Sequence, residues 1–155
     1  MPFQIKGLRA EVFAPFFALQ DDELAKHRAR IVTATSKPGY PCRVSLADAE
    51  AGERLLLINY THLETSSPFR ASHAIYVREG VASFIPGAGE VPPALAIRQI
   101  SVRLFDKQDE IIRSVILPGT EIAEFLERTF AEDGVAFAHL HYAANGCFAA
   151  AAVRA

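Results

Sequence analysis

Strand-like segments follow one another along this chain mostly without helices between them, and this pattern limits the folds it can form. Residues 98–105 show it most clearly, since Ile100, Val102 and Leu104 alternate with polar residues. The polar turn DKQD then joins this segment to a second strand at 110–117. Strands joined by short turns pair antiparallel, whereas parallel strands need a crossover connection. The other strand-like segments are 3–7, 30–35, 54–62, 73–79, 135–142 and 147–153.

Helical patterns are few. Residues 10–28 predict two helical pieces divided near Pro15, and Ser45 resembles the cap of a short helix. Thr120 should cap the most strongly amphipathic helix, in which apolar residues recur at i, i+3, i+4 and i+7. The chain contains no internal repeat, low-complexity tract or linker. The sequence therefore predicts one compact α+β domain over residues 1–155, a mostly antiparallel β-sheet packed by a few helices.

Charge and hydropathy argue against two classes of partner. Sixteen Lys and Arg residues oppose 18 Asp and Glu residues, giving a net charge of −2 without a basic block, so we expect no nucleic-acid partner. No apolar run approaches the ~20 residues that span a bilayer, so we expect no membrane partner. The N-terminal residues lack the pattern of a secretory signal, which predicts a cytoplasmic protein. Cys42 and Cys147 should then be free thiols.

Two histidines stand at strand ends that antiparallel pairing would bring together. His62 ends the segment 54–62, and His73 begins the segment 73–79. In an antiparallel pair the end of one strand lies beside the start of the next, so the two imidazoles should be neighbours. Arg70 belongs to the loop between these strands and should lie above the pair.

A second set of polar residues gathers around the final hairpin and a proline-rich loop. His141 should lie near Cys147 at the hairpin turn, and the loop PGYPCR carries Cys42 and Arg43. If this loop folds over the same sheet edge, one pocket is lined by Arg43, Arg70, His73, His141 and Cys42. Two converging guanidinium groups favour a small anion, such as a carboxylate or a phosphate, because their N–H groups match it bidentately.

The leading hypothesis is a small enzyme or a binding protein for an anionic ligand. The residues that would bind the ligand are Arg43, Arg70 and His62. The catalytic candidates are Cys42, His73 and His141, with His141 as an acid or base and Cys42 as a nucleophile. No cofactor is implied, and the sequence leaves open whether the chain is an enzyme.

Two other interpretations remain open. In the first, the same residues only order loops, and the chain is a non-catalytic interaction module such as a homodimer. In the second, His139 and His141, two residues apart on a strand, chelate a metal ion with His62 or His73 as third ligand. No carboxylate is placed to complete that set, so we expect no stoichiometric zinc or iron.

Four strings spread along the chain carry a family resemblance: KPGYPCRVSLADAEAGE, LLLINYTH, SPFRASHAIYVRE and HLHYAANGCFAA. In this order they resemble a bacterial family of single-domain proteins labelled only as a domain of unknown function. The resemblance covers nearly the whole chain. It implies a compact cytosolic bacterial protein, and it brings no established activity, cofactor or catalytic residue.

Overall fold

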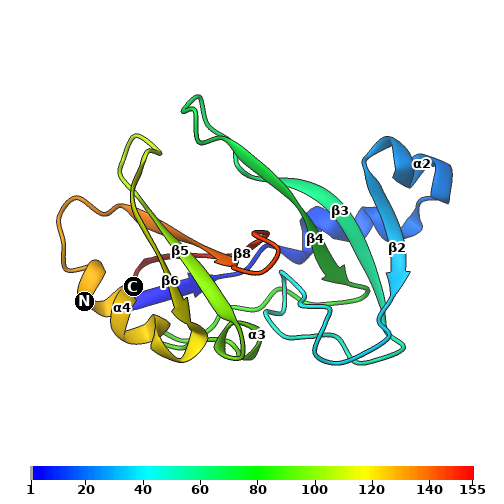
Figure 1. The fold of residues 1–155 in the computed structure, drawn as a ribbon. Helices are drawn as coiled ribbons and strands as arrows, with labels where there is room; N and C mark the ends of the chain where they lie inside the picture. Colours follow the sequence, from blue (N-terminus) through cyan, green and yellow to red (C-terminus); the bar gives the residue numbers. More distant parts are fainter. Residues whose placement is uncertain (1) are drawn as a thin grey trace.

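Two antiparallel β-sheets form the body of the protein in the computed structural model, which describes residues 2–155 (Figure 1). Sheet A has the strand order β1-β8-β7-β5-β6, and sheet B has the order β2-β3-β4. The strands of sheet A are β1 (Phe3–Lys6), β5 (Gln99–Phe105), β6 (Ile111–Pro118), β7 (Phe137–Tyr142) and β8 (Phe148–Arg154). Those of sheet B are β2 (Ala29–Thr33), β3 (Arg54–Leu63) and β4 (Ala71–Arg78). The predicted α+β fold with mostly antiparallel pairing is confirmed.

The helices are short, and the longest of them covers one face of sheet A (Figure 1). Helix α4 packs Ile122 and Leu126 into one buried core with the β5 residues Ile100, Val102 and Leu104. Because side chains alternate along a strand, the polar residues of β5 and the histidines of β7 face the other way, toward sheet B. The helices are α1 (Ala10–Phe13), η1 (Ala14–Ala18), α2 (Asp21–Lys26), α3 (Pro93–Ala96), η2 (Gly119–Glu121) and α4 (Ile122–Thr129).

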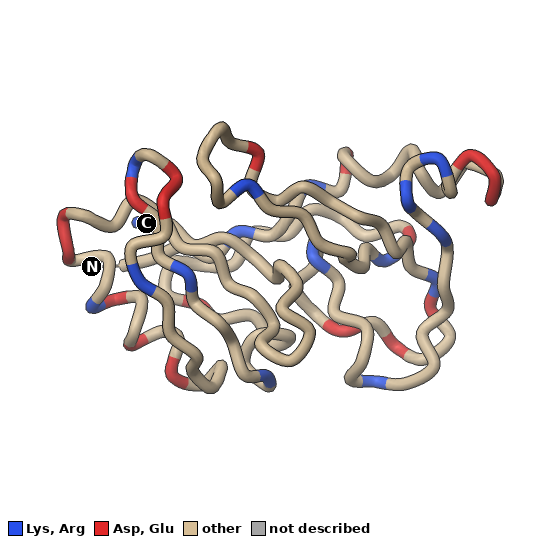
Figure 2. The backbone as a smooth tube through the Cα atoms, turned by 45° about the horizontal axis from the view of Figure 1, so that its top comes forward, with Lys and Arg blue, Asp and Glu red and all other residues tan. Residues whose placement is uncertain are grey.

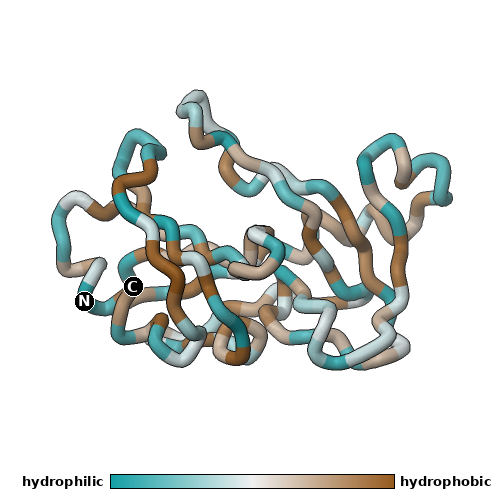
Figure 3. The backbone as a smooth tube through the Cα atoms, viewed as in Figure 1, coloured by the Kyte–Doolittle hydropathy of each residue, from teal (hydrophilic) through white to brown (hydrophobic). Residues whose placement is uncertain are grey.

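A second core supports sheet B. Phe13 of α1 and Leu24 of α2 are buried in it together with Ile58 of β3 and Val77 of β4. Apolar residues concentrate along the strands, whereas the tips of the β3–β4 and β5–β6 hairpins are hydrophilic (Figure 3). Each sheet therefore has its own apolar support, and the faces that the two sheets turn toward each other can carry polar groups.

The loop between β2 and β3 contains no α-helix, so the predicted helix at Ser45 is wrong. The Asp48 carboxylate, expected to help begin that helix, instead accepts hydrogen bonds from the Gly39 N–H at 2.8 Å and from Arg98 at 2.6 and 2.7 Å. Thr120 does not cap α4 either, since it lies within η2 and no side-chain hydrogen bond caps the helix. Both errors come from local patterns that tertiary contacts override.

Positively and negatively charged residues are intermingled along the backbone, without a block of one sign (Figure 2). No helix within residues 2–155 is long and apolar enough to cross a membrane. Cys42 and Cys147 are both free cysteines, as predicted.

Candidate functional site

Three histidines from the two sheets meet where the sheets face each other. His62 lies near the end of β3, His73 near the start of β4, and His141 in β7. Their ring centroids are 5.8 Å apart for His62 and His73, 5.1 Å for His62 and His141, and 6.0 Å for His73 and His141. Together with His139, whose ring lies 5.6 Å from that of His62, they form what we call the histidine cluster. The predicted proximity of His62 and His73 is confirmed, and the β3–β4 hairpin meets the β7–β8 hairpin here.

β-Bulges lie beside the cluster in both hairpins. In the β3–β4 pairing the register shifts between Thr61 and Leu63, which leaves His62 as the extra residue. In the β7–β8 pairing it shifts between Leu140 and His141. A bulge bends a strand and re-aims the side chains next to it. These two irregularities are therefore well placed to turn His62 and His141 toward each other.

The imidazoles of the cluster have few hydrogen-bond partners. Both ring nitrogens of His62 and the Nδ1 of His139 are buried without a partner among residues 2–155. In His141 the Nδ1 lies 2.9 Å from the Gly146 carbonyl oxygen. A carbonyl can only accept, so Nδ1 of His141 carries the proton and Nε2 keeps its lone pair.

Burial keeps the cluster uncharged at neutral pH. It lowers the pKa of His62 and His139 from 6.5 to about 4, and that of His141 to about 3. The pKa of His73 is lowered as well, first by burial and then by the positive charge of Arg103. Neutral imidazole is the form that accepts protons and binds metal ions.

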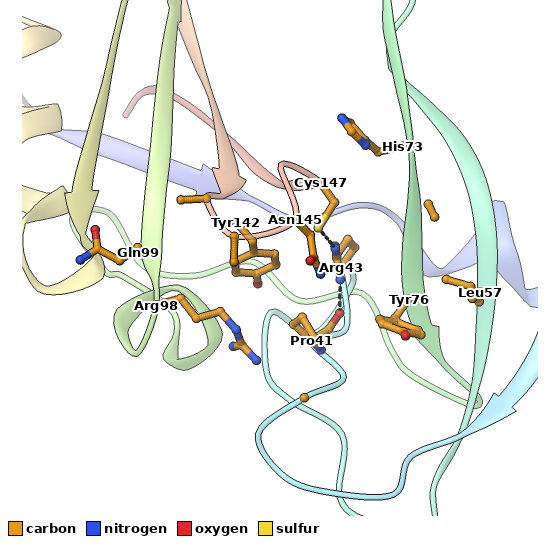
Figure 4. A pocket seen from close by; sticks show the side chains of 14 residues that line it. Pro41, Arg43, Leu57, His73, Tyr76, Arg98, Gln99, Tyr142, Asn145 and Cys147 are labelled. Atoms are coloured by element: carbon orange, nitrogen blue, oxygen red, sulfur yellow. Dashed lines mark hydrogen bonds between the residues drawn. The ribbon is translucent and has the colours of Figure 1, made fainter.

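A pocket of about 660 Å³ adjoins the cluster and shares His73 with it (Figure 4). Tyr142 and Arg98 lie on one side of it, and Tyr76 and Leu57 lie on the other (Figure 4). The lining combines sheet B (Leu57, His73, Ala74, Tyr76), sheet A with the β7–β8 turn (Gln99, Tyr142, Ala143, Ala144, Asn145, Cys147), Arg98 after α3, and the loop residues Gly39, Pro41 and Arg43. The pocket therefore depends on both sheets and on the proline-rich loop.

Arg43 is only 2% exposed and fastens the proline-rich loop to both sheets. Its Nε donates to the Phe148 carbonyl at 2.7 Å, and its Nη1 donates to the Pro41 carbonyl at 2.6 Å. Its Nη2 lies 3.0 Å from the Cys147 sulfur, and its backbone N–H donates to the Tyr76 carbonyl at 2.9 Å. The side chain thus has a structural use, and all of these partners are uncharged.

Tyr142 lies against two arginines. The guanidinium carbons of Arg43 and Arg98 are 5.0 and 5.1 Å from the centre of its ring. Its hydroxyl is buried without a hydrogen-bond partner in the described part of the chain, and burial raises its pKa to about 12. At neutral pH the hydroxyl is therefore a proton donor that lacks an acceptor.

Arg98 differs from Arg43 because a carboxylate matches its charge. It forms a two-pronged ion pair with Asp48, whose side chain is only 4% exposed. Burial alone would raise the pKa of Asp48, but the hydrogen bonds from Arg98 and from the Gly39 N–H outweigh it and lower that pKa.

The five residues expected to line one pocket do not all converge, since only Arg43 and His73 line it. Arg70 is exposed and pairs with Glu64 at 2.9 and 3.1 Å. Cys42 is completely buried. Its sulfur accepts hydrogen bonds from the backbone of Ser45 and Arg78, so it does not face a ligand. The fifth residue, His141, lies beside the pocket in the histidine cluster, together with His62, the remaining predicted ligand-binding residue.

Sequence reasoning did not identify Tyr142 or Arg98. Alternation puts Tyr142 on the opposite face of β7 from His141, which is typical of a core residue. Its place as the last residue of a strand, where a long side chain can reach past the sheet, was the available signal. Arg98 offers no local signal, because its partner Asp48 lies 50 residues away in the sequence.

A family model described as a protein of unknown function (DUF1203) matches residues 39–154. The histidine cluster and all the residues that line the pocket lie within this range. No curated protein and no solved structure matches the chain.

Proposed function

We propose that the chain, which belongs to the family described as a protein of unknown function (DUF1203), binds a small organic anion in the pocket beside the histidine cluster. The single observation that carries this proposal is the Tyr142 hydroxyl, a buried donor with no acceptor among residues 2–155. The anionic group, a carboxylate or a phosphate, would lie at Tyr142, and an apolar body would lie along the pocket walls.

The hydroxyl supports a ligand because an unpaired buried donor is destabilising. Leaving such a group without a partner costs about 1–3 kcal/mol. Phenylalanine would fill the same place in the core without this loss. A ligand oxygen at hydrogen-bond distance would provide the missing acceptor, and the raised pKa of Tyr142 keeps the proton on the phenol.

The charge at this end of the pocket favours an anion. Asp48 balances Arg98, whereas the side chain of Arg43 has two carbonyls and a thiol as partners. A guanidinium carries five N–H donors, and Arg43 uses three of them. Buried charges are stable when they are paired, so a carboxylate or phosphate next to Tyr142 would offset the excess positive charge.

The walls favour an apolar body on the ligand. Leu57, Ala74 and Tyr76 line one side, and Ala143 lies near Tyr142 on the other. The volume of about 660 Å³ is within the usual range for small-molecule sites. An aromatic or branched carboxylate, or the corresponding phosphate ester, matches both the polar end and the apolar walls.

Calorimetric titration of EDTA-treated protein with benzoate and with phenyl phosphate tests the proposal. We expect at least one of the two to bind, and benzamide, the uncharged analogue of benzoate, to bind about tenfold more weakly or not at all. Tyr142→Phe should weaken binding about tenfold, because it removes one hydrogen bond to a charged group. Tyr60→Phe is the matched control, since Tyr60 packs against Phe13 outside the pocket lining. Absence of binding by both anions, or equal affinity in Tyr142→Phe, would contradict the proposal.

A cytoplasmic location is part of this proposal. Cys147 is partly exposed in the pocket wall and remains unpaired, as does Cys42. Accessible unpaired thiols persist in reducing compartments. Protein alkylated in a cell extract under denaturing conditions, which expose the buried Cys42, should carry two labelled cysteines per chain, and oxidation of Cys147 in that sample would argue against this location.

A further inference from the structure

The proposed anion uses the Tyr142 end of the pocket and leaves the histidine cluster without a role. We infer that His62, His73 and His141 bind one divalent transition-metal ion of the zinc class. The three residues come from two sheets, and each offers a ring nitrogen within 4.8 Å of those of the other two. Three imidazoles with an open fourth position form a well-known zinc-binding arrangement.

The distances between the nitrogens require only small movements, whereas the stacked rings of His62 and His73 must turn relative to each other, because a metal ion lies close to the plane of each imidazole that binds it. Zinc binds imidazole nitrogen at about 2.0–2.1 Å, so two nitrogens of a tetrahedral site lie about 3.4 Å apart. The nitrogens here are at most 4.8 Å apart, so ring rotations that move each of them by about an ångström close the site. His62 can turn without breaking any hydrogen bond, because neither of its ring nitrogens has a partner in residues 2–155.

His141 is already oriented as a ligand. Its Nδ1–H donates to the Gly146 carbonyl at 2.9 Å, which leaves the lone pair on Nε2. Metal-binding histidines usually donate their second ring N–H to a carbonyl or a carboxylate in this way, and the bond fixes both the tautomer and the ring orientation. Burial also holds the three imidazoles in the neutral form that a metal ion requires.

Packing alone does not explain why His62 is a histidine. The His62 ring is stacked against the rings of His73 and Phe148, and its plane is nearly parallel to both. The ring centroids are 5.8 Å apart for His73 and 4.8 Å apart for Phe148. A phenyl ring would fill this position equally well and would bury no unpaired nitrogen. Buried polar atoms normally have partners, so two unpaired nitrogens on one ring indicate a ligand that binds there.

The positive charge of Arg103 limits what the fourth ligand can be. Arg103 pairs in register with His139 on the neighbouring strand, and its charge lowers the pKa of His73 and of His139. It therefore opposes a bare dication, and an anionic fourth ligand would offset that repulsion.

The expected absence of zinc or iron rests on the lack of a carboxylate near His139 and His141. His62 and His73 of sheet B complete a set of three imidazoles with His141. This set contains no carboxylate, so the lack of one is no longer a reason to expect no metal. His139 lies next to this set and is outside it, with its ring 6.4 Å from that of His141.

Zinc chloride titrated into metal-free protein, in competition with a chromophoric chelator and without any organic anion, tests the inference. We expect one zinc ion per chain, and His62→Ala should weaken binding about 100-fold or more, since it removes a direct ligand. His27→Ala is the control, because His27 is the one histidine outside the cluster and is exposed at the end of α2. Failure of the wild type to bind zinc, or the same loss in His27→Ala as in His62→Ala, would overturn the inference.

Cobalt(II) provides a second readout that does not depend on the folding of a variant. Wild-type protein should give the visible absorption of a four-coordinate cobalt centre, and one equivalent of zinc should abolish it. A six-coordinate spectrum would overturn the inference. The two proposals can fail separately: zinc binding without benzoate or phenyl phosphate binding contradicts only the proposed function, and the reverse result contradicts only the metal site.

Discussion

The two buried polar regions of this protein are built in opposite ways. Around Arg43 and Arg98, hydrogen bonds to carbonyls and to Asp48 hold the charged groups. In the other region, the Tyr142 hydroxyl and the Nδ1 of His139 are buried without a hydrogen-bond partner among the described residues. Neither ring nitrogen of His62 has such a partner either. The regions are adjacent, since His73 and both arginines line the same pocket, so burial alone does not explain the difference.

This difference separates groups that stabilise the fold from groups available to bind. A paired polar group contributes to stability, whereas an unpaired one destabilises the protein until a ligand or ion joins it. We therefore assign the arginines chiefly to holding the loop at Pro41 against both sheets. The histidines and the Tyr142 hydroxyl are assigned to binding.

Breaking the paired region should have the largest effect. Arg98→Met leaves the Asp48 carboxylate buried without its counter-ion, and we expect a loss of about 3–5 kcal/mol in the free energy of unfolding. Arg113→Met is the matched control, because Arg113 forms an exposed ion pair with Glu132 at 2.9 Å and should lose about 1 kcal/mol or less. Urea unfolding of both variants measures the difference, and equal losses would remove the distinction between the regions.

The histidine cluster should make the metal-free protein sensitive to mild acid. Burial lowers the pKa of His139 to about 4 and that of His141 to about 3, against 6.5 for an exposed histidine. Between these values the unfolded chain binds protons that the folded chain does not, so stability present above pH 6.5 is lost as the pH falls. The loss should be roughly 1 kcal/mol per pH unit for each of the two residues.

Urea unfolding of EDTA-treated protein at several pH values measures that slope. His139→Leu should make the dependence of the free energy of unfolding on pH less steep, because the variant has one fewer histidine that stays neutral in the folded state. A wild-type protein whose stability is flat between about pH 6.5 and about pH 4.5 would mean that the cluster is not held neutral by burial.

Tyr142→Phe removes an unpaired buried group, whereas Arg98→Met removes a paired one. The two substitutions should therefore have opposite effects on the free energy of unfolding. Loss of an unpaired hydroxyl should leave the free energy of unfolding within about 0.5 kcal/mol of the wild type or raise it by about 1 kcal/mol. Thermal and urea unfolding without ligand measure this change. A loss above about 1 kcal/mol would show that the hydroxyl has a stabilising partner in the free protein.

Arg70→Ala should have the smallest effect. Arg70 forms an exposed ion pair with Glu64, so its removal should leave the free energy of unfolding unchanged within the error of the measurement. Affinity for benzoate and phenyl phosphate should also be unchanged, since Arg70 is outside the pocket lining. If Arg70→Ala binds benzoate or phenyl phosphate more weakly than Tyr142→Phe does, Arg70 belongs to the anion-binding site.

Some of the site could be predicted from the sequence, because it depends on local pairing. Antiparallel order in one hairpin is enough to make His62 and His73 neighbours. The meeting of these residues with His141 could be hypothesised from the sequence but not established, since it depends on how two separate sheets pack and on bulges that alternation does not reveal. The structural role of Arg43 could not be predicted for the same reason, because the Phe148 carbonyl that accepts its hydrogen bond lies 105 residues away in the sequence.

Anomalous diffraction from crystals of the protein grown with zinc would show whether the three histidines bind the ion, because it locates the ion without mutation. We expect one strong peak between the sheets, about 2.0–2.1 Å from a nitrogen of each of His62, His73 and His141. We also expect the Nδ1 of His141 still to face the Gly146 carbonyl. A map without a peak there, or with zinc only at the exposed His27, would contradict the claim that His62, His73 and His141 form a binding site.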